Sequence, residues 1–324
     1  GVATVVFSDL SSNPRAAEVM TGAALYRAHG CDVLVAVGGG SAIDCAKGIG
    51  IVVAEGRSVL AFEGVDKLDV PTPPLVCVPT TSGSAADVSQ FAIILDEPQR
   101  RKVAIVSKML VPDVSLLDPE TLTTMPADVS AFTGLDALTH AIEAYVSNAH
   151  FSLTDMMALE AVERVRRFLL PSLAEPLNVD YRNGMMLASL NAGMAFSNAI
   201  LGAVHAMAHS LGGETDAPHG ECNALLLGPV VGQNFCAAPD RYREIARRLG
   251  LTLPAAEPKA AAALADGLER LRRQAGLTRS LRDLGVSRKQ LRRMMENALA
   301  DPCMATNPRR YSAEEVVRIY EQVY

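Results

Sequence analysis

The 324-residue chain lacks three features that would place it in particular classes of protein. No apolar run approaches about 18 residues, so we expect no membrane-spanning helix. Positive charge is not in excess, because 30 Lys and Arg stand against 36 Asp and Glu, and the net charge of −6 argues against nucleic acid or an anionic membrane as the main partner. The six cysteines form no CxxC pair, and no basic stretch followed by an apolar one opens the chain. We therefore expect a protein of the reducing cytoplasm.

The length predicts about two domains, and the texture of the sequence changes near residue 120. The first third contains short, apolar, β-branched runs that predict strands, at 4–7, 32–37, 74–79, 90–95 and 102–107. Helical patterns occupy 16–30, which closes on Gly30, and 41–56. Strands that are apolar on both faces and separated by helices predict a parallel sheet covered on both sides. Residues 1–125 are therefore predicted to form an α/β nucleotide-type domain.

The remaining residues, 126–324, are rich in Ala, Leu and Met and show little strand signal. Helical segments punctuated by proline and glycine are predicted at 137–146, 153–170, 185–196, 203–211, 241–249 and 268–275. We expect this second domain to be entirely helical.

Two polar loops directly follow predicted buried strands. In VGGGSAID (37–44) three glycines lie between a strand and a helix, a place where backbone N–H groups and the helix dipole favour an anion such as a pyrophosphate. The alternative is a tight structural turn in which Ser41 and Asp44 form a capping box. PTTSGS (79–84) carries hydroxyls after the next strand, where such folds bind ligands. The motif is not GxGxxG, so the usual dinucleotide fingerprint is absent.

Histidines and one aspartate recur at helical spacing. Asp136 and His140 are four residues apart, as are His205 and His209, and each pair therefore lies on one helix face. His219 follows after a Gly-Gly break. One carboxylate with several imidazoles suits a borderline divalent cation, although any one of these histidines could instead be a satisfied core residue. No thiolate belongs to the set, so a closed structural zinc site is not expected. His29 and His150 lack such neighbours and are predicted to lie on the surface.

The segments GGGSAIDCAK (38–47), PTTSGSAADV (79–88), DALTHAIEAY (136–145) and HAMAHSLGG…HGECN (205–223) together resemble the iron-containing (group III) alcohol dehydrogenases. The resemblance covers nearly the whole chain. It implies a Rossmann-like N-terminal domain and an all-helical C-terminal domain in a dehydroquinate synthase-like architecture, with the active site in the cleft between them. It implies four metal ligands (Asp136, His140, His205 and His219), with His209 as the catalytic histidine near the substrate. It also implies dinucleotide contacts from Asn13, Gly39, Gly40, Ser41, Asp44, Thr80, Thr81, Ser84 and Lys102.

The implied activity is NAD(P)-dependent interconversion of an alcohol and an aldehyde or ketone, with Fe2+ or Zn2+ and in a homodimer. The family opens with a strand and helix that help to choose between NAD and NADP, and we do not find them before residue 4. NAD is expected, and NADP stays open. A zinc-dependent glycerol dehydrogenase-like enzyme of the same superfamily is one alternative. A metal-dependent hydrolase and a non-catalytic nucleotide sensor are alternatives from other classes.

Overall fold

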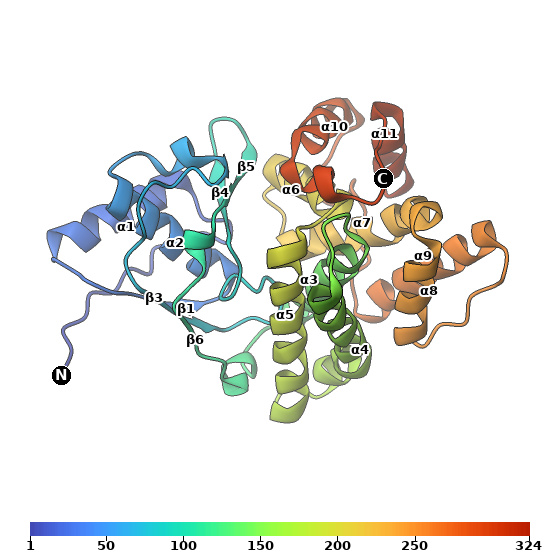
Figure 1. The fold of residues 1–324 in the computed structure, drawn as a ribbon, viewed down its shortest axis with the longest axis horizontal. Coiled ribbons are helices and arrows are strands. Elements are labelled where there is room, and N and C mark those ends of the chain that lie inside the picture. Colours follow the sequence, from blue (N-terminus) through green and yellow to red (C-terminus); the bar gives the residue numbers. More distant parts are fainter. The chain divides into compact units, whose positions relative to one another are not determined.

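The computed structural model describes all 324 residues and divides into two compact units. The first comprises residues 1–80 and 86–118, and the second comprises 81–85 and 119–324. The first unit holds parallel strands with helices, and the second is helical, which confirms the predicted fold class (Figure 1). The TTSGS loop is divided between the units, because Thr80 belongs to the first and residues 81–85 to the second.

A parallel sheet in the first unit carries the glycine-rich loop. Its strands are β1 (Leu34–Gly38), β3 (Leu75–Pro79) and β6 (Val114–Ser115), in the order β1-β3-β6. Helix α2 (Gly40–Glu55) packs against β1 and β3, and α1 (Ala16–Ala28) packs against α2. A glycine with positive φ follows each helix, Gly30 after α1 and Gly56 after α2. Gly38 pairs with Pro79 in the register of β1 and β3, so the glycine and hydroxyl loops begin at the same edge of the sheet.

A second sheet in the same unit corrects the prediction of one parallel sheet. Strands β2 (Gly64–Val65), β5 (Arg101–Val106) and β4 (Phe91–Asp96) lie in the order β2-β5-β4. β4 and β5 are antiparallel. The reason is the connection between them, which spans only residues 97–100, whereas a crossover to a parallel strand needs a dozen residues or more.

Two further strand predictions were wrong in part. Residues 4–7 form no strand, and Val6 is 81% exposed. β1 is a strand, but Val35 and Val37 are each 64% exposed rather than covered on both faces. Val35 and Val37 share one face of β1, while the buried Ala36 between them points to the opposite face, so only one face of this strand is covered.

The second unit is built around α3 (Ala127–Val146), which is buried over most of its length. It packs against α4 (Ser152–Ala174), α5 (Val179–Ala199) and α7 (His219–Asn234), while α6 (Ala203–Thr215) packs against α7 (Figure 1). The remaining helices are α8 (Pro239–Arg248), α9 (Glu257–Gln274), α10 (Leu291–Ala300) and α11 (Ala313–Gln322). The first unit also contains the 3-10 helices η1 (Val59–Phe62) and η2 (Lys108–Leu110). The second contains η3 (Pro119–Leu122), η4 (Phe235–Ala237), η5 (Arg288–Gln290) and η6 (Pro302–Thr306).

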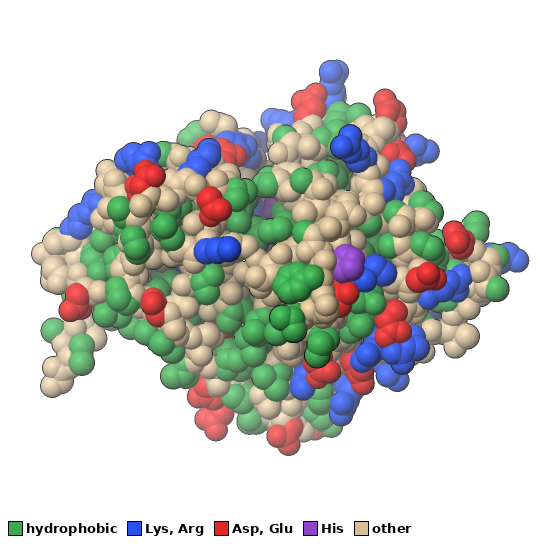
Figure 2. All heavy atoms as spheres, viewed as in Figure 1, with side chains coloured by type: hydrophobic (Ala, Val, Ile, Leu, Met, Phe, Trp, Pro, Cys, Tyr) green, Lys and Arg blue, Asp and Glu red, His purple; other side chains and the backbone are tan.

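Charged side chains of both signs are interspersed over the helical unit. Figure 2 shows blue and red side chains next to one another over α4 and α8. Arg248 of α8, for example, pairs with Glu163 of α4 at 2.8 Å and with Glu244 of its own helix at 3.0 Å. No single helix is long and apolar enough to cross a membrane; α5 and α6 pass that test only as a pair, bent by 102°.

Candidate active site

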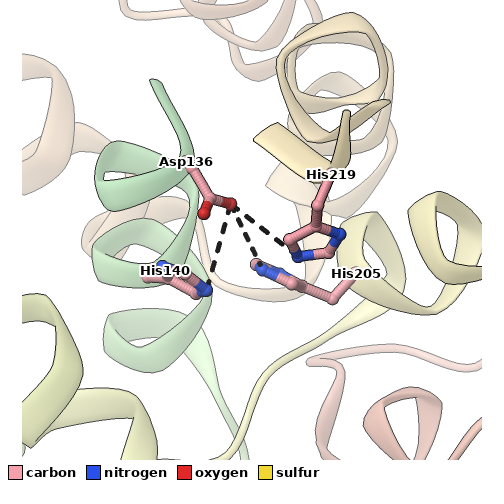
Figure 3. Close-up of side chains that lie close together, drawn as sticks. All are labelled: Asp136, His140, His205 and His219. Atoms are coloured by element: carbon pink, nitrogen blue, oxygen red, sulfur yellow. Dashed lines mark ion pairs between the residues drawn. The ribbon is translucent and has the colours of Figure 1, made fainter. Parts of the chain in front are cut away.

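Four side chains of the helical unit converge on one point (Figure 3). Asp136 and His140 project from α3, His205 from the first turn of α6, and His219 is the first residue of α7. The Nε2 atoms of His140, His205 and His219 lie 4.0, 3.8 and 3.9 Å from Asp136 Oδ1. All but His219 are buried, and the His219 side chain is 26% exposed. The sequence prediction that these residues form one cluster therefore agrees with the structure.

The separations are close to those of a tetrahedral metal site. Four donors bound tetrahedrally at about 2.0–2.2 Å lie about 3.3–3.6 Å from one another. The three distances from Asp136 to the histidines, 3.8–4.0 Å, exceed this by a few tenths of an ångström, and all four donor atoms lie within 4.8 Å of one another. No cysteine lies among them, so the donor set is nitrogen and oxygen only.

Asn223 shows that these donors suit a cation. It is fully buried on α7, and its Nδ2 lies 2.6 Å from Asp136 Oδ1, 3.0 Å from His205 Nε2 and 3.1 Å from His219 Nε2. An amide nitrogen has two hydrogens and cannot satisfy three acceptors. At least one of the three acceptors around Asn223 Nδ2 therefore lacks a hydrogen. The Oδ1 atom of Asn223 also has no hydrogen-bond partner. A divalent cation would satisfy all the converging lone pairs, so the residues fit the metal.

Hydrogen bonds at Nδ1 fix the ring orientations of two of these histidines. His140 Nδ1 lies 3.2 Å from the carbonyl oxygen of Gly83, and His205 Nδ1 lies 2.6 Å from Glu143 Oε2. Such bonds place the hydrogen on Nδ1 and leave the Nε2 lone pair for a metal. Burial, followed by the neighbouring His140, lowers the pKa of His205 well below its usual value, which keeps the ring in the neutral form that a metal requires.

Glu143 is a functional residue that the sequence analysis missed. Its carboxylate accepts the backbone N–H groups of Gly202 (3.0 Å) and Val204 (2.7 Å), so it caps the start of α6 while it also holds His205. Burial raises its pKa to about 7, against the opposing effect of these hydrogen bonds. A signal was present, because Asp136, His140 and Glu143 are spaced by four and then three residues and share one face of α3.

His209 lies beside the cluster of Asp136, His140, His205 and His219 but does not belong to it. Its ring stacks on that of His219, with centroids 5.2 Å apart, and meets the ring of His205 edge-on at 6.0 Å. Its Nδ1 is 2.8 Å from Asp301 Oδ2, a residue that the sequence analysis did not single out. The predicted separation of His209 from the ligand set is consistent with this arrangement.

The first unit brings together several of the predicted dinucleotide residues. Gly39 is the N-cap of α2, and Gly40 and Ser41 begin the helix, whose first N–H groups have no acceptor within the helix. Ser41 Oγ donates to the carbonyl of Ser12, next to the buried Asn13. The backbone N–H of Thr80 donates to Gly38 O at 2.9 Å.

The capping-box interpretation of this loop was wrong. Ser41 bonds the 12–13 loop rather than the helix, and Asp44 accepts the backbone N–H of Ile93 at 3.2 Å. Burial raises the pKa of Asp44 to about 6, although Lys47 and Lys102 oppose the rise. Asp44 therefore ties α2 to β4, and Lys102 of β5 lies near it rather than in the glycine loop. Neither Gly39 nor Gly40 has a positive φ, so backbone strain does not require glycine at these two positions.

Thr81 and Ser84, the other two predicted dinucleotide residues, belong to the helical unit. They flank Gly83, whose carbonyl accepts the hydrogen bond from His140. A Cβ at Gly83 would lie only 2.6 Å from the carbonyl oxygen of Thr133 on α3, so this loop packs closely against the helix that carries Asp136 and His140. Contact of Thr81 and Ser84 with a dinucleotide stays a prediction.

Comparison with known proteins supports one class throughout. Residues 1–119 match the family described as "Iron-containing alcohol dehydrogenase", and residues 130–324 match "Fe-containing alcohol dehydrogenase family, C-terminal". The 1,3-propanediol dehydrogenase of Klebsiella pneumoniae is 41% identical, over 100% of this chain and 84% of that protein. The lactaldehyde reductase of Escherichia coli K12 is 36% identical, over 100% and 85%.

Solved structures give the same result. An alcohol dehydrogenase from Oenococcus oeni superposes with a TM-score of 0.96 at 37% identity, covering 100% of this chain and 85% of that one. A 1,3-propanediol oxidoreductase superposes with a TM-score of 0.94 at 39% identity, covering 99% and 84%. The fold and the comparisons define an oxidoreductase of alcohols and aldehydes. The chain belongs to the iron-containing alcohol dehydrogenase family.

Proposed function

We propose that this protein is an NAD(P)-dependent alcohol dehydrogenase that holds one divalent metal, Fe2+ or Zn2+, through Asp136, His140, His205 and His219. The convergence of these four donors within 4.8 Å of one another is the observation that carries the proposal. When bound, the metal would act as a Lewis acid toward the substrate oxygen and the dinucleotide would exchange a hydride with the substrate carbon. NAD is the expected dinucleotide, with NADP open.

The chain's own residues would bind and orient these groups. The start of α2 at Gly39, Gly40 and Ser41 offers N–H groups to a pyrophosphate. Glu143 and the carbonyl of Gly83 hold His205 and His140 with Nε2 toward the metal. His209 would hold the hydroxyl proton as the catalytic histidine.

The names of the relatives suggest a substrate class for the proposed enzyme. Those named above act, by their names, on 1,3-propanediol and lactaldehyde, and a methanol dehydrogenase of Bacillus methanolicus is 32% identical. We therefore propose short alcohols and the matching aldehydes as substrates. A homodimer and a cytoplasmic location stay predictions from the sequence.

The test is NADH formation by the protein loaded with Fe2+ under anaerobic conditions or with Zn2+, using a panel of methanol, ethanol, 1,2-propanediol, 1,3-propanediol and glycerol. We expect alcohol-dependent NADH formation that a chelator removes and that added metal restores. A preference for glycerol with zinc would favour the glycerol dehydrogenase-like alternative. Metal-dependent ester or amide hydrolysis without any dinucleotide turnover would favour the hydrolase. NADH binding without turnover would favour a nucleotide sensor.

Glu143→Gln is expected to weaken metal binding by about 10- to 100-fold, the usual effect of losing the carboxylate behind a metal-bound histidine. Glutamine keeps the size of the side chain and can still accept from the start of α6, but it removes the charge beside His205 Nδ1. Competition with a coloured chelator measures the change. The matched control is Glu163→Gln on α4, whose partner is the surface residue Arg248. Equal metal affinity in the two variants would contradict the role assigned to Glu143.

A further inference from the structure

A second buried carboxylate lies behind His209. Asp301 follows α10 directly and is far from His209 in sequence, yet its Oδ2 lies 2.8 Å from His209 Nδ1. Both side chains are more than nine-tenths buried, with exposures of 7% and 9%. A buried carboxylate that bonds an imidazole at this distance restricts which ring nitrogen carries the hydrogen.

The other oxygen of Asp301 is also engaged. Oδ1 accepts the backbone N–H of Cys303 at 2.8 Å and so caps η6. Burial alone would raise the pKa of Asp301, but His209 and the hydrogen bonds from Cys303 outweigh burial and lower it. Asp301 is therefore an ionised carboxylate, fixed in orientation, that can only accept hydrogen bonds.

A metal ion shared by His209, Asp301 and Cys303 is a weaker explanation of the same cluster, although their donor atoms lie within 4.8 Å of one another. Burial and the charge of Asp301 raise the pKa of the Cys303 thiol well above its usual value, whereas a metal needs the thiolate. The three groups already satisfy one another by hydrogen bonds.

An acceptor-only partner determines the tautomer of His209. The hydrogen in the bond to Asp301 must be on Nδ1, so the neutral ring carries its lone pair on Nε2. The His209 ring stacks on the ring of His219 and meets the ring of His205 edge-on. The histidine that carries this Nε2 lone pair therefore lies beside the four proposed metal ligands.

We propose that Asp301 is a positioning residue that holds His209 in the Nδ1–H tautomer, so that His209 Nε2 accepts the hydroxyl proton of the alcohol. This inference rests on the proposed function. In the forward direction the substrate O–H bond breaks, its electron pair becomes part of the new C=O bond, and the proton goes to Nε2. The electron pair of the substrate C–H bond leaves with the hydride for the nicotinamide of NAD+. The resulting imidazolium is paired with the Asp301 carboxylate, and in aldehyde reduction Nε2 returns the proton.

Asp301→Asn separates positioning from the structural role of this residue. The amide oxygen can still accept from Cys303 N–H and keep the cap, while the amide NH2 faces His209 and donates to Nδ1. The hydrogen of the ring then moves to Nε2, which can no longer accept. We expect kcat to fall at least about 100-fold, within the usual range for general acid–base groups, while metal content, NADH affinity and KM stay near those of the wild type.

Two comparisons sharpen this test. His209→Ala should lower kcat to a similar degree, and the double variant should be no slower than His209→Ala alone, because the two residues act as one unit. Asp283→Asn is the matched control, since that exposed carboxylate accepts hydrogen bonds from the backbone N–H and the hydroxyl of Ser280.

A spectroscopic readout of the ring hydrogens needs no turnover. In the zinc-loaded wild-type protein, 1H–15N correlation of the histidine rings should show His209 protonated on Nδ1 and not on Nε2, and Asp301→Asn should reverse this pattern. An Nε2–H tautomer in the wild type overturns the proposal. So does a normal kcat in Asp301→Asn, or loss of its metal along with activity. If the wild type forms no NADH from any alcohol, the proposed function fails, whereas the spectrum still reports on the positioning of His209.

Discussion

His205→Ala is expected to remove the metal and to lower kcat/KM by about 1,000-fold or more, because a Lewis acid contributes several kcal/mol to the transition state. His205 is fully buried at the centre of the cluster and contacts His140, His209, His219 and Glu143. Its loss removes one of four donors and leaves the carboxylate of Glu143 without the imidazole. Metal per chain, measured by elemental analysis after anaerobic purification, and NADH formation should fall together.

His150→Ala is the control for this variant. That histidine is exposed and pairs only with Asp155, at 3.2 Å, so its removal should change neither metal content nor turnover. A melting curve of each protein without metal shows whether the fold survives. A His205→Ala protein that keeps one metal per chain and near-normal turnover would remove the ligand assignment and the main support for the proposed function.

The site was predictable where its geometry is local to one helix. Spacings of four residues place Asp136 with His140, and His205 with His209, whatever the tertiary structure. The same rule would have found Glu143 two turns after Asp136. Asp301 could not be found in this way, because its contact with His209 joins the end of α10 to α6 across 92 residues and carries no periodic signal.

The elements of the fold, too, were predictable where local sequence determines them and not where they depend on long-range packing. Helix α2 was predicted almost to the residue, because a glycine loop precedes it and Gly56 ends it in a left-handed conformation. Helices α7, α10 and α11 were not identified at all. α7 contains Pro229 and α10 is short, so their stability depends on packing against α9 and α6 rather than on local preference. The strand predicted at 4–7 failed for a similar reason, since a strand exists only with a partner and this segment has none.

Gly220→Ala is expected to damage the metal centre through the backbone alone. Gly220 follows His219 in the first turn of α7, where α7 approaches α3 closely. A Cβ there would collide with the carbonyl oxygen of Phe132, and it would lie 2.8 Å from the carbonyl carbon of that residue and 3.2 Å from Asp136 Cβ. These atoms belong to the backbone of α3 and to the Cβ of Asp136, so they cannot move aside as the end of a flexible side chain would. The start of α7 must move away, and His219 moves with it.

We expect Gly220→Ala to lower the free energy of unfolding by about 1–3 kcal/mol, as overpacking does, and to raise the metal dissociation constant at least tenfold. Gly232→Ala is the matched control in the same helix, because its Cβ would meet only Ala265 Cβ at an ordinary 3.5 Å. That change should be neutral or stabilise the protein by up to about 1 kcal/mol, since alanine favours the helix. Chemical denaturation and chelator competition on both variants decide the matter. If Gly220→Ala behaves like Gly232→Ala in both measurements, then α7 can shift without cost, and the close contact between α3 and α7 does not set the position of His219.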